Sequence, residues 1–412
     1  MRVLTALTPQ TAIAGHSTTT PFRLRTLRIA ALAFSLLAGC AGHHAPPQVD
    51  TQRVMQFSEH GYLTDNRFDI STSFSNWGTG EYDFDMTWTM PVSGRNLPLV
   101  VYMPGLGEAS SAGEAWCKAW AQAGYAVLAV QPLAEDRKAW SSSAARRGDF
   151  GAIAKERYSA TAVTARMQAL ATLLGEVRKR GSAGDAQATR VDTTRVALAG
   201  FDIGAYTSML VAGELPPSNA APIRQPLPIA AVIALSPYAD FSGHPFAERY
   251  QAITGPVLSV SGYEDADALG AVPSPAVRKA PFEYMPSRDA YLLWLANARH
   301  TTMSGSAIAV GETPAANDAA APADEGRGSR QGSSRHGRRS GGSGGGNERG
   351  AQTGGIRNTS ESPTERAITT TLTKDVTIAF LDAYMKMDPV AREWLHKDAV
   401  RWIGDRGELR WK

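Results

Sequence analysis

Three side chains that could perform hydrolytic chemistry follow apolar runs of the sequence. Asp202 comes directly after "RVALAGF", Asp265 closes "GPVLSVSGYED", and His300 closes "AYLLWLANARH". These runs are predicted to be buried parallel strands, whose carboxyl ends meet at one edge of the sheet, where active sites form. A histidine oriented by a carboxylate can act as a general base for a nucleophile or a water molecule. The sequence therefore predicts one catalytic group made of Asp202, His300 and Asp265.

The stretch "VALAGFDIGAY" (196–206) is predicted to turn sharply from a strand into a helix. Gly200 and Gly204 permit the close approach of strand and helix that such a turn requires. The turn holds its central residue, Asp202, in a strained backbone conformation and exposes its side chain at the sheet edge. It also directs the next backbone N–H, that of Ile203, at a developing negative charge.

Strands and helices alternate along most of the chain, which predicts an α/β fold with a mostly parallel sheet covered on both faces. The predicted strand segments are 82–90, 96–107, 126–133, 195–201, 229–238, 255–265 and 290–300. The predicted helices are 111–125, 155–180, 204–214 and 366–388.

The alternation stops at residues 304–365, which include "GRGSRQGSSRHGRRSGGSGGGNERG". The segment has very few apolar side chains, and their burial cannot offset the entropy that the chain would lose on folding. We therefore predict that it is disordered. It is either a basic arm that contacts lipopolysaccharide, phospholipid or peptidoglycan, or, as we favour, an insertion tolerated in a surface loop. Residues 366–412 then complete the domain that begins at 81, starting with an amphipathic helix.

Several of these segments together resemble one enzyme superfamily. "VDTTRVALAGFDIGAYTSMLVAGE" is similar to the nucleophile elbow of the α/β-hydrolases, particularly the dienelactone hydrolase and platelet-activating-factor acetylhydrolase-like group. "LPLVVYMPGLG", "GPVLSVSGYED", "AYLLWLANARHTTMSG" and "AFLDAYMKMDPVAREWL" resemble the oxyanion-loop strand, the acid strand, the histidine loop and the final helix of that group. The resemblance covers residues 82–303 and 366–395 and implies the α/β-hydrolase fold without a large cap domain.

The resemblance also implies roles for individual residues. His300 would be the base and Asp265 the carboxylate that orients it, with Glu264 and Asp267 as close alternatives. The backbone N–H groups of Leu106 and Ile203 would form an oxyanion hole.

The chain departs from this family at the decisive position, because Asp202 stands where the family has serine. A carboxylate can attack an sp³ carbon and form an alkyl ester that a histidine-activated water hydrolyses. At an acyl carbon it would form an anhydride, which is much less favourable, so ordinary esterase chemistry is not expected. The carboxylate could also occupy the oxyanion hole and block it.

Haloalkane dehalogenases and epoxide hydrolases have aspartate at the elbow, but the rest of this chain fits them poorly. Residues 239–254 are too few to form their cap domain, and the loop "MPGLGE" lacks their tryptophan. Within residues 134–180, Trp140 and Tyr158 are candidates to cover the pocket.

Two functions therefore remain. The first is a hydrolase of a small organic substrate, with Asp202 as the nucleophile or as a base for water. The second is a non-catalytic binding or envelope protein on a hydrolase scaffold. A net charge of +3 argues against a nucleic-acid partner. No cluster with metal-ligand spacing and no glycine-rich phosphate loop is present, so no metal or cofactor is predicted. His244 is a loop residue that could line the pocket.

The first 40 residues contain arginines, a short apolar run and the ending "LAGC", which resembles the lipobox of bacterial lipoproteins. The resemblance implies cleavage before Cys40 and acylation of its thiol, which anchors the chain to a membrane of the cell envelope. Ala41 after the cysteine implies sorting to the outer membrane. A plain secretory signal cut near "AGHHA" is the alternative. Residues 41–80 are predicted to be a polar tether and lead-in, and Cys117 a buried helical cysteine.

Overall fold

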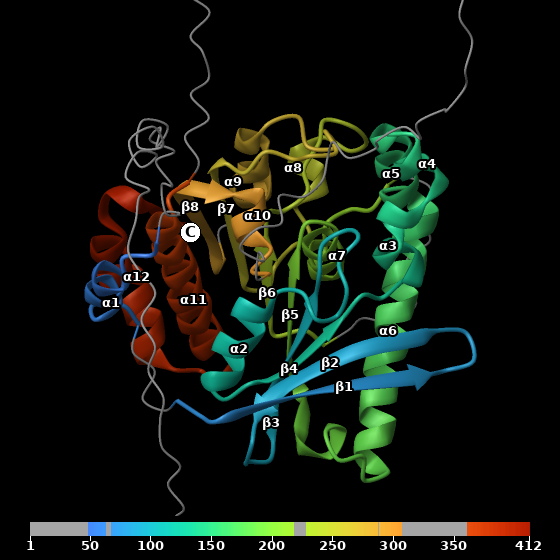
Figure 1. Cartoon of the computed structure of the whole chain (residues 1–412), viewed down its shortest axis with the longest axis horizontal. Helices are drawn as coiled ribbons and strands as arrows, with labels where there is room; N and C mark the ends of the chain where they lie inside the picture. Colours follow the sequence, from blue (N-terminus) through green and yellow to red (C-terminus); the bar gives the residue numbers. More distant parts are fainter. Residues whose placement is uncertain (1–47, 63–66, 218–227, 287, 307–360) are drawn as a thin grey trace, which may run out of the picture. The chain divides into compact units, whose positions relative to one another are not determined.

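One nine-stranded sheet runs through the part of the chain that the structure describes (Figure 1). Its strand order is β1-β2-β4-β3-β5-β6-β7-β8-β9. Strands β3 to β8 are parallel to one another, whereas β1, β2 and β9 lie antiparallel to their neighbours. The strands are β1 (Ile70–Gly78), β2 (Asp83–Pro91), β3 (Leu97–Met103), β4 (Ala126–Val130), β5 (Val191–Phe201), β6 (Ala231–Leu235), β7 (Val257–Glu264), β8 (Ala290–Arg299) and β9 (Gly407–Trp411). The predicted α/β class with a mostly parallel sheet is confirmed.

The structure is a computed structural model that describes residues 48–62, 67–217, 228–286, 288–306 and 361–412. Residues 48–412 cluster into one unit. The predicted signal peptide with Cys40, and nearly all of the predicted insertion, lie outside the described residues. Within the described ranges, no helix combines the length and the apolar character needed to cross a membrane.

Helices cover both faces of the sheet. In Figure 1, α11 and α12 (red) lie on one side of the strands and α6 (green) lies on the other. The helices are α1 (Thr51–Ser58), α2 (Glu114–Gln122), α3 (Ala134–Arg137), α4 (Ser143–Arg146), α5 (Phe150–Arg157), α6 (Ala160–Ser182), α7 (Ile203–Ala212), α8 (Phe246–Arg249), α9 (Ala280–Tyr284), α10 (His300–Met303), α11 (Pro363–Met385) and α12 (Pro389–Ile403).

Alternation along the central strands supplies both cores. In β3, Val100 and Tyr102 pack into the core that contains residues of α2, α11 and α12. Leu99 and Val101 face the opposite way, into the core that contains residues of α6 and α7. Because successive strand residues point to opposite faces, a strand buried on both sides is apolar throughout. The apolar stripe predicted for the last long helix is buried as expected, at Ile368, Leu372, Val376, Phe380 and Ala383.

The structure corrects the predicted boundaries at three places. Residues 41–80 are not all tether, because α1 and the edge strand β1 lie within them. Helix α11 begins at Pro363, inside the predicted insertion. The closing strand β9 was not predicted. Both β1 and β9 are edge strands with many exposed polar side chains, so they lack the apolar run that identifies a central strand.

Two glycines set the geometry of the turn between β5 and α7. A Cβ atom at Gly200 would overlap the backbone of Gly204, and a Cβ atom at Gly204 would overlap the carbonyl oxygen of Met103 at the end of β3. The first residues of α7 therefore press against the ends of two strands. Only glycine leaves room for this contact.

We expect Gly204→Ala to lower the free energy of unfolding by about 3 kcal/mol, because the added methyl group meets rigid backbone on β3. Gly175→Ala in α6 is the matched control, since a Cβ atom there has open space. That change should raise stability by about 0.5–1 kcal/mol through helix propensity. Urea unfolding of both variants measures the difference. A Gly204→Ala protein as stable as the wild type would show that the turn can relax.

Candidate active site

Asp202 occupies the sharp turn that the sequence predicted. Its backbone has φ 53° and ψ −113°, a region that non-glycine residues rarely adopt, and α7 begins at the next residue. The Asp202 N–H donates to the carbonyl oxygen of Leu235 in β6, at 3.0 Å. A backbone conformation of this kind costs about 1–3 kcal/mol and is found mostly at functional sites.

Both carboxylate oxygens of Asp202 accept hydrogen bonds. The backbone N–H of Leu106 donates to Oδ2 at 3.3 Å, and the hydroxyl of Tyr158 donates to Oδ1 at 2.8 Å. Asp202 is 7% exposed. Ile203 is the first residue of α7, and N–H groups in a first helical turn have no acceptor within their own helix. Of the two backbone N–H groups predicted to form the oxyanion hole, that of Leu106 therefore binds the Asp202 carboxylate itself, because it donates to Oδ2.

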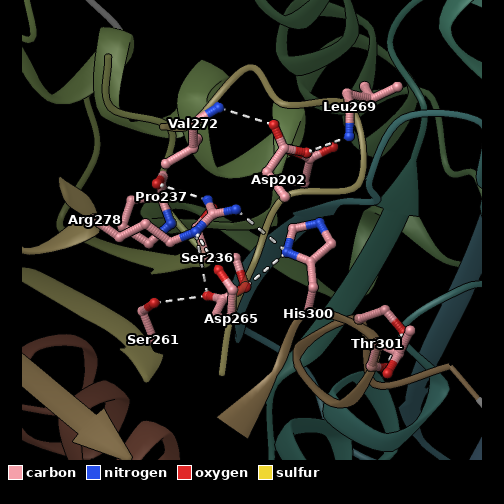
Figure 2. Close-up of polar contacts among 12 residues, drawn as sticks. Asp202, Ser236, Pro237, Ser261, Asp265, Leu269, Val272, Arg278, His300 and Thr301 are labelled. Atoms are coloured by element: carbon pink, nitrogen blue, oxygen red, sulfur yellow. Dashed lines mark hydrogen bonds and ion pairs between the residues drawn. The ribbon is translucent and has the colours of Figure 1, made fainter. Parts of the chain in front are cut away.

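His300 and Asp265 form a direct pair. Their Nδ1 and Oδ1 atoms lie 2.7 Å apart, and Asp265 is fully buried (Figure 2). The hydroxyl of Ser261 donates to the other carboxylate oxygen at 2.6 Å. A contact this short between an imidazole nitrogen and a carboxylate places the proton on Nδ1, which leaves Nε2 as the basic nitrogen.

The two alternative carboxylates serve other partners. Glu264 pairs with Arg299 at 2.8 Å and is partly exposed. Asp267 accepts the backbone N–H groups of Leu269 and Val272, at 3.0 and 2.9 Å. Because Glu264 and Asp267 bind these other groups, Asp265 is the carboxylate that binds His300.

The pKa values of this pair shift in opposite directions. Burial opposes ionisation of His300, but the hydrogen bond to Asp265 and the negative charges of Asp265 and Asp202 outweigh it and raise the pKa of His300 above 6.5. Burial likewise opposes ionisation of Asp265, but His300, Arg278 and Ser261 together lower the pKa of this carboxyl group. The protein therefore stabilises an imidazolium at His300, as a general base requires.

Arg278 is a buried support for the pair that sequence reasoning missed. It donates to the backbone oxygens of Ser236, Pro237 and Asp265 at 2.8, 3.0 and 3.1 Å, and its Nε lies 3.5 Å from the Asp265 carboxylate (Figure 2). It joins the loops after β6 and β7. No signal in the sequence identified it, because arginine side chains are usually exposed.

Glu108 links the loop after β3 to the histidine loop, and it was also missed. It accepts the backbone N–H of Gly105 at 2.8 Å and the hydroxyl of Ser306 at 3.2 Å. Burial raises the pKa of Glu108, although both hydrogen bonds oppose the shift; the charge of Asp202 adds to the increase. Glu108 ends the segment "MPGLGE". Its position shortly after a buried strand is the one feature of the sequence that could have identified it as a site residue.

The segment between β4 and α6 covers the turn. Leu106 and Ile203 pack in one small core with Ala139 and Ile153 from this segment. Trp140 lies so close to Gly107 that a Cβ atom there would overlap its indole ring. Tyr158, at the end of α5, reaches Asp202 directly. Of the two residues that the sequence suggested as a cover, Trp140 thus lies over the loop after β3, and Tyr158 lies over Asp202.

A cavity of about 330 Å³ adjoins the turn through Tyr158. The rings of Tyr206 and Tyr238 stand beside Tyr158, with the centroids of Tyr158 and Tyr238 4.3 Å apart. Arg249 and His244 also line this cavity. Burial, followed by the charge and hydrogen bond of Asp202, raises the pKa of Tyr158, so its hydroxyl stays protonated and donates.

Among the described residues, no group of three or more His, Cys, Asp or Glu side chains could hold a metal ion. Cys117, predicted to be buried in a helix, is a buried free thiol on α2. Comparison of the chain with protein-family models and with curated protein sequences finds no match.

We expect Asp265→Asn to lower the pKa of His300, because the burial that opposes ionisation remains while a charge and a strong acceptor are lost. Asp267→Asn, in the same loop, should leave this pKa nearly unchanged. Histidine-selective NMR titration of the two variants measures the effect.

The raised pKa of His300 also makes stability depend on pH. Protonated His300 stabilises the folded state fully below its unfolded pKa of about 6.5, and this contribution is lost as pH rises through the folded value. Asp265→Asn should reduce that loss. Equal pKa shifts in the two variants would contradict the assignment of Asp265 as the orienting carboxylate.

Proposed function

We propose that this chain is a hydrolase that attacks an electrophilic sp³ carbon of a small organic molecule through the carboxylate of Asp202. The observation that supports this most is the arrangement of the turn at Asp202 together with the Asp265–His300 pair. Asp202 stands on a strained turn with Oδ2 against the Leu106 N–H, and the Asp265–His300 pair acts on it electrostatically. The finer assignment to the α/β-hydrolase fold is part of the same proposal.

In the first step, Oδ1 of Asp202 attacks the substrate carbon. A new carbon–oxygen bond forms, and the bond to the leaving group breaks with its electron pair going to that group. The product is an alkyl ester of Asp202. The hydroxyl of Tyr158 donates to Oδ1, and Tyr158 also lines the neighbouring cavity. This hydroxyl can therefore donate a hydrogen bond to the departing group.

In the second step, His300 removes a proton from water through Nε2, and the resulting hydroxide attacks Cγ of the ester. Negative charge then develops on Oδ2, which already accepts the N–H of Leu106. Collapse of this intermediate breaks the bond between Cγ and the ester oxygen, and the departing alkoxide takes the proton from His300 and leaves as the alcohol. The new carboxyl group keeps the oxygen from water and releases its proton to solvent, which restores the carboxylate. Asp265 stabilises the imidazolium between these events.

We expect the wild type to hydrolyse an epoxide or an alkyl halide, and Asp202→Asn to lose at least about 10³-fold in kcat. His300→Gln should stop after the first step, so that the protein gains the mass of the alkyl group. Intact-protein mass spectrometry detects this adduct, and Asp202→Asn should never carry it. His244→Ala is the control for a histidine that only lines the cavity. Full activity in both Asp202→Asn and His300→Gln would refute the mechanism.

The second step needs neutral His300, so its rate should rise with pH through the raised pKa of this histidine. The midpoint is expected above pH 6.5. Single-turnover measurement of ester hydrolysis against pH locates it.

A binding role is the second candidate, and one observation favours it. Both oxygens of Asp202 are already engaged by Leu106 and Tyr158, so the carboxylate occupies the place of a substrate oxyanion. If the wild type is inactive on epoxides, alkyl halides, lactones and aryl esters while Asp202→Ser gains aryl esterase activity, this candidate replaces the first.

We also propose that the chain is a lipoprotein of the cell envelope, anchored through acylated Cys40, on the strength of "LAGC" after a short apolar run. Cys40→Ser should abolish incorporation of labelled fatty acid and move the protein out of the membrane fraction. Acylation that persists in Cys40→Ser would exclude this anchor.

A further inference from the structure

A second cavity, of about 520 Å³, lies between α2, α10 and α11 and shares no lining residue with the cavity beside Asp202. Its cationic side chains come from two helices: Lys118 on α2, and Arg366 and Lys374 on α11. Among the described residues that line it, Glu114 is the only acidic one, and it already pairs with Lys118. Three cationic side chains thus line one space. Lys118 is paired with Glu114 and Arg366 with Glu361, whereas Lys374 has neither of these partners.

Lys374 is the cation of this cavity whose environment is least compensated. Burial lowers its pKa, and the positive charges of Arg67 and Lys118 add to that effect although Asp375 opposes it. In the described part of the chain, its ammonium group has no hydrogen bond or salt bridge. Burial also raises the pKa of Asp375 to about 7, so this neighbour compensates the charge of Lys374 only in part at neutral pH.

Arg366 adds unused hydrogen-bonding capacity. Its Nε donates to Glu361 at 3.2 Å. The contacts within the described residues do not use the two terminal nitrogens of its guanidinium group, which presents a planar fork of donors. Thr301, on α10, lines the same space. Donors from α2, α10 and α11 therefore converge on one cavity.

We propose that this cavity binds a phosphate group, either as the headgroup of an anionic phospholipid or as free phosphate. Several cations held close together repel one another, and an anion between them removes that repulsion. Phosphate suits the site because its oxygens accept charge-assisted hydrogen bonds from lysine and arginine at the same time.

The headgroup source fits the path of the chain. Asp50 donates its N–H to Thr364 at 2.8 Å, in the first turn of α11, and this position is ten residues after Cys40. Ten extended residues span at most about 35 Å. If Cys40 is acylated as proposed above, the start of α11 stays within that distance of the anchor.

The test uses the whole chain with Cys40→Ser, so that no acyl group drives membrane binding. Inorganic phosphate is titrated by calorimetry, and sedimentation compares vesicles of phosphatidylcholine with vesicles that also contain phosphatidylglycerol. Lys374→Met, which keeps the apolar stem, should weaken binding at least about tenfold, and Lys374→Arg should restore most of it. Lys397→Met on α12, where the lysine is largely exposed, is the control for the loss of one positive charge.

Saturable binding of phosphate that depends on Lys374 supports the proposal with free phosphate as the ligand. Binding only to the anionic vesicles, again dependent on Lys374, supports it with the headgroup as the ligand. Lack of binding to either probe overturns it, and so does binding that Lys374→Met and Lys397→Met weaken equally. Thermal unfolding shows that each variant is folded. Neither result depends on the activity at Asp202, so this proposal and the proposed function can fail separately.

Discussion

The close contact between the start of α7 and the ends of β3 and β5 controls the geometry of the candidate site. Gly200 and Gly204 leave no room for a side chain at that contact. The chain must therefore reverse within one residue, and Asp202 takes the strained backbone conformation at the turn. Because β3 and β5 are parallel neighbours, the same contact brings the loop after β3 over the turn, and the Leu106 N–H reaches the Asp202 carboxylate.

A second constraint is the burial of charge beside this turn. Asp265 and Arg278 are both fully buried, so each needs polar partners, and together they join the loops after β6 and β7 and hold His300. A buried ion of this kind is costly unless its hydrogen bonds are satisfied. The network therefore fixes one position for the imidazole ring and stabilises its charged form. Chemistry at Asp202 would use that stabilisation when His300 accepts a proton from water.

The two cavities differ in the way each could recognise a ligand. The cavity beside Asp202 is lined by three tyrosine rings that pack against one another, and its buried Arg249 forms ion pairs with Glu214 and Asp240. Such walls suit an uncharged molecule that packs against aromatic surface. The described residues that line the cavity beside α11 include three cations and one carboxylate, and none of them is aromatic, so this cavity suits an anion. The candidate reactive site and the candidate anion site thus lie beside different cavities.

The sequence by itself determined the α/β class, the central strands and the turn at Asp202, because these depend on apolar runs and on glycine, which are local signals. It also placed Asp202, Asp265 and His300 after strands, and parallel pairing then brought them to one edge. Only the tertiary structure decided that Asp265, and not Glu264 or Asp267, binds His300, and that Tyr158, Glu108 and Arg278 belong to the site. Those contacts join segments far apart in the chain, and each depends on how loops fold over the sheet edge. Polar edge strands such as β1 were missed for a related reason, since pairing with a neighbour forms them and an apolar pattern does not.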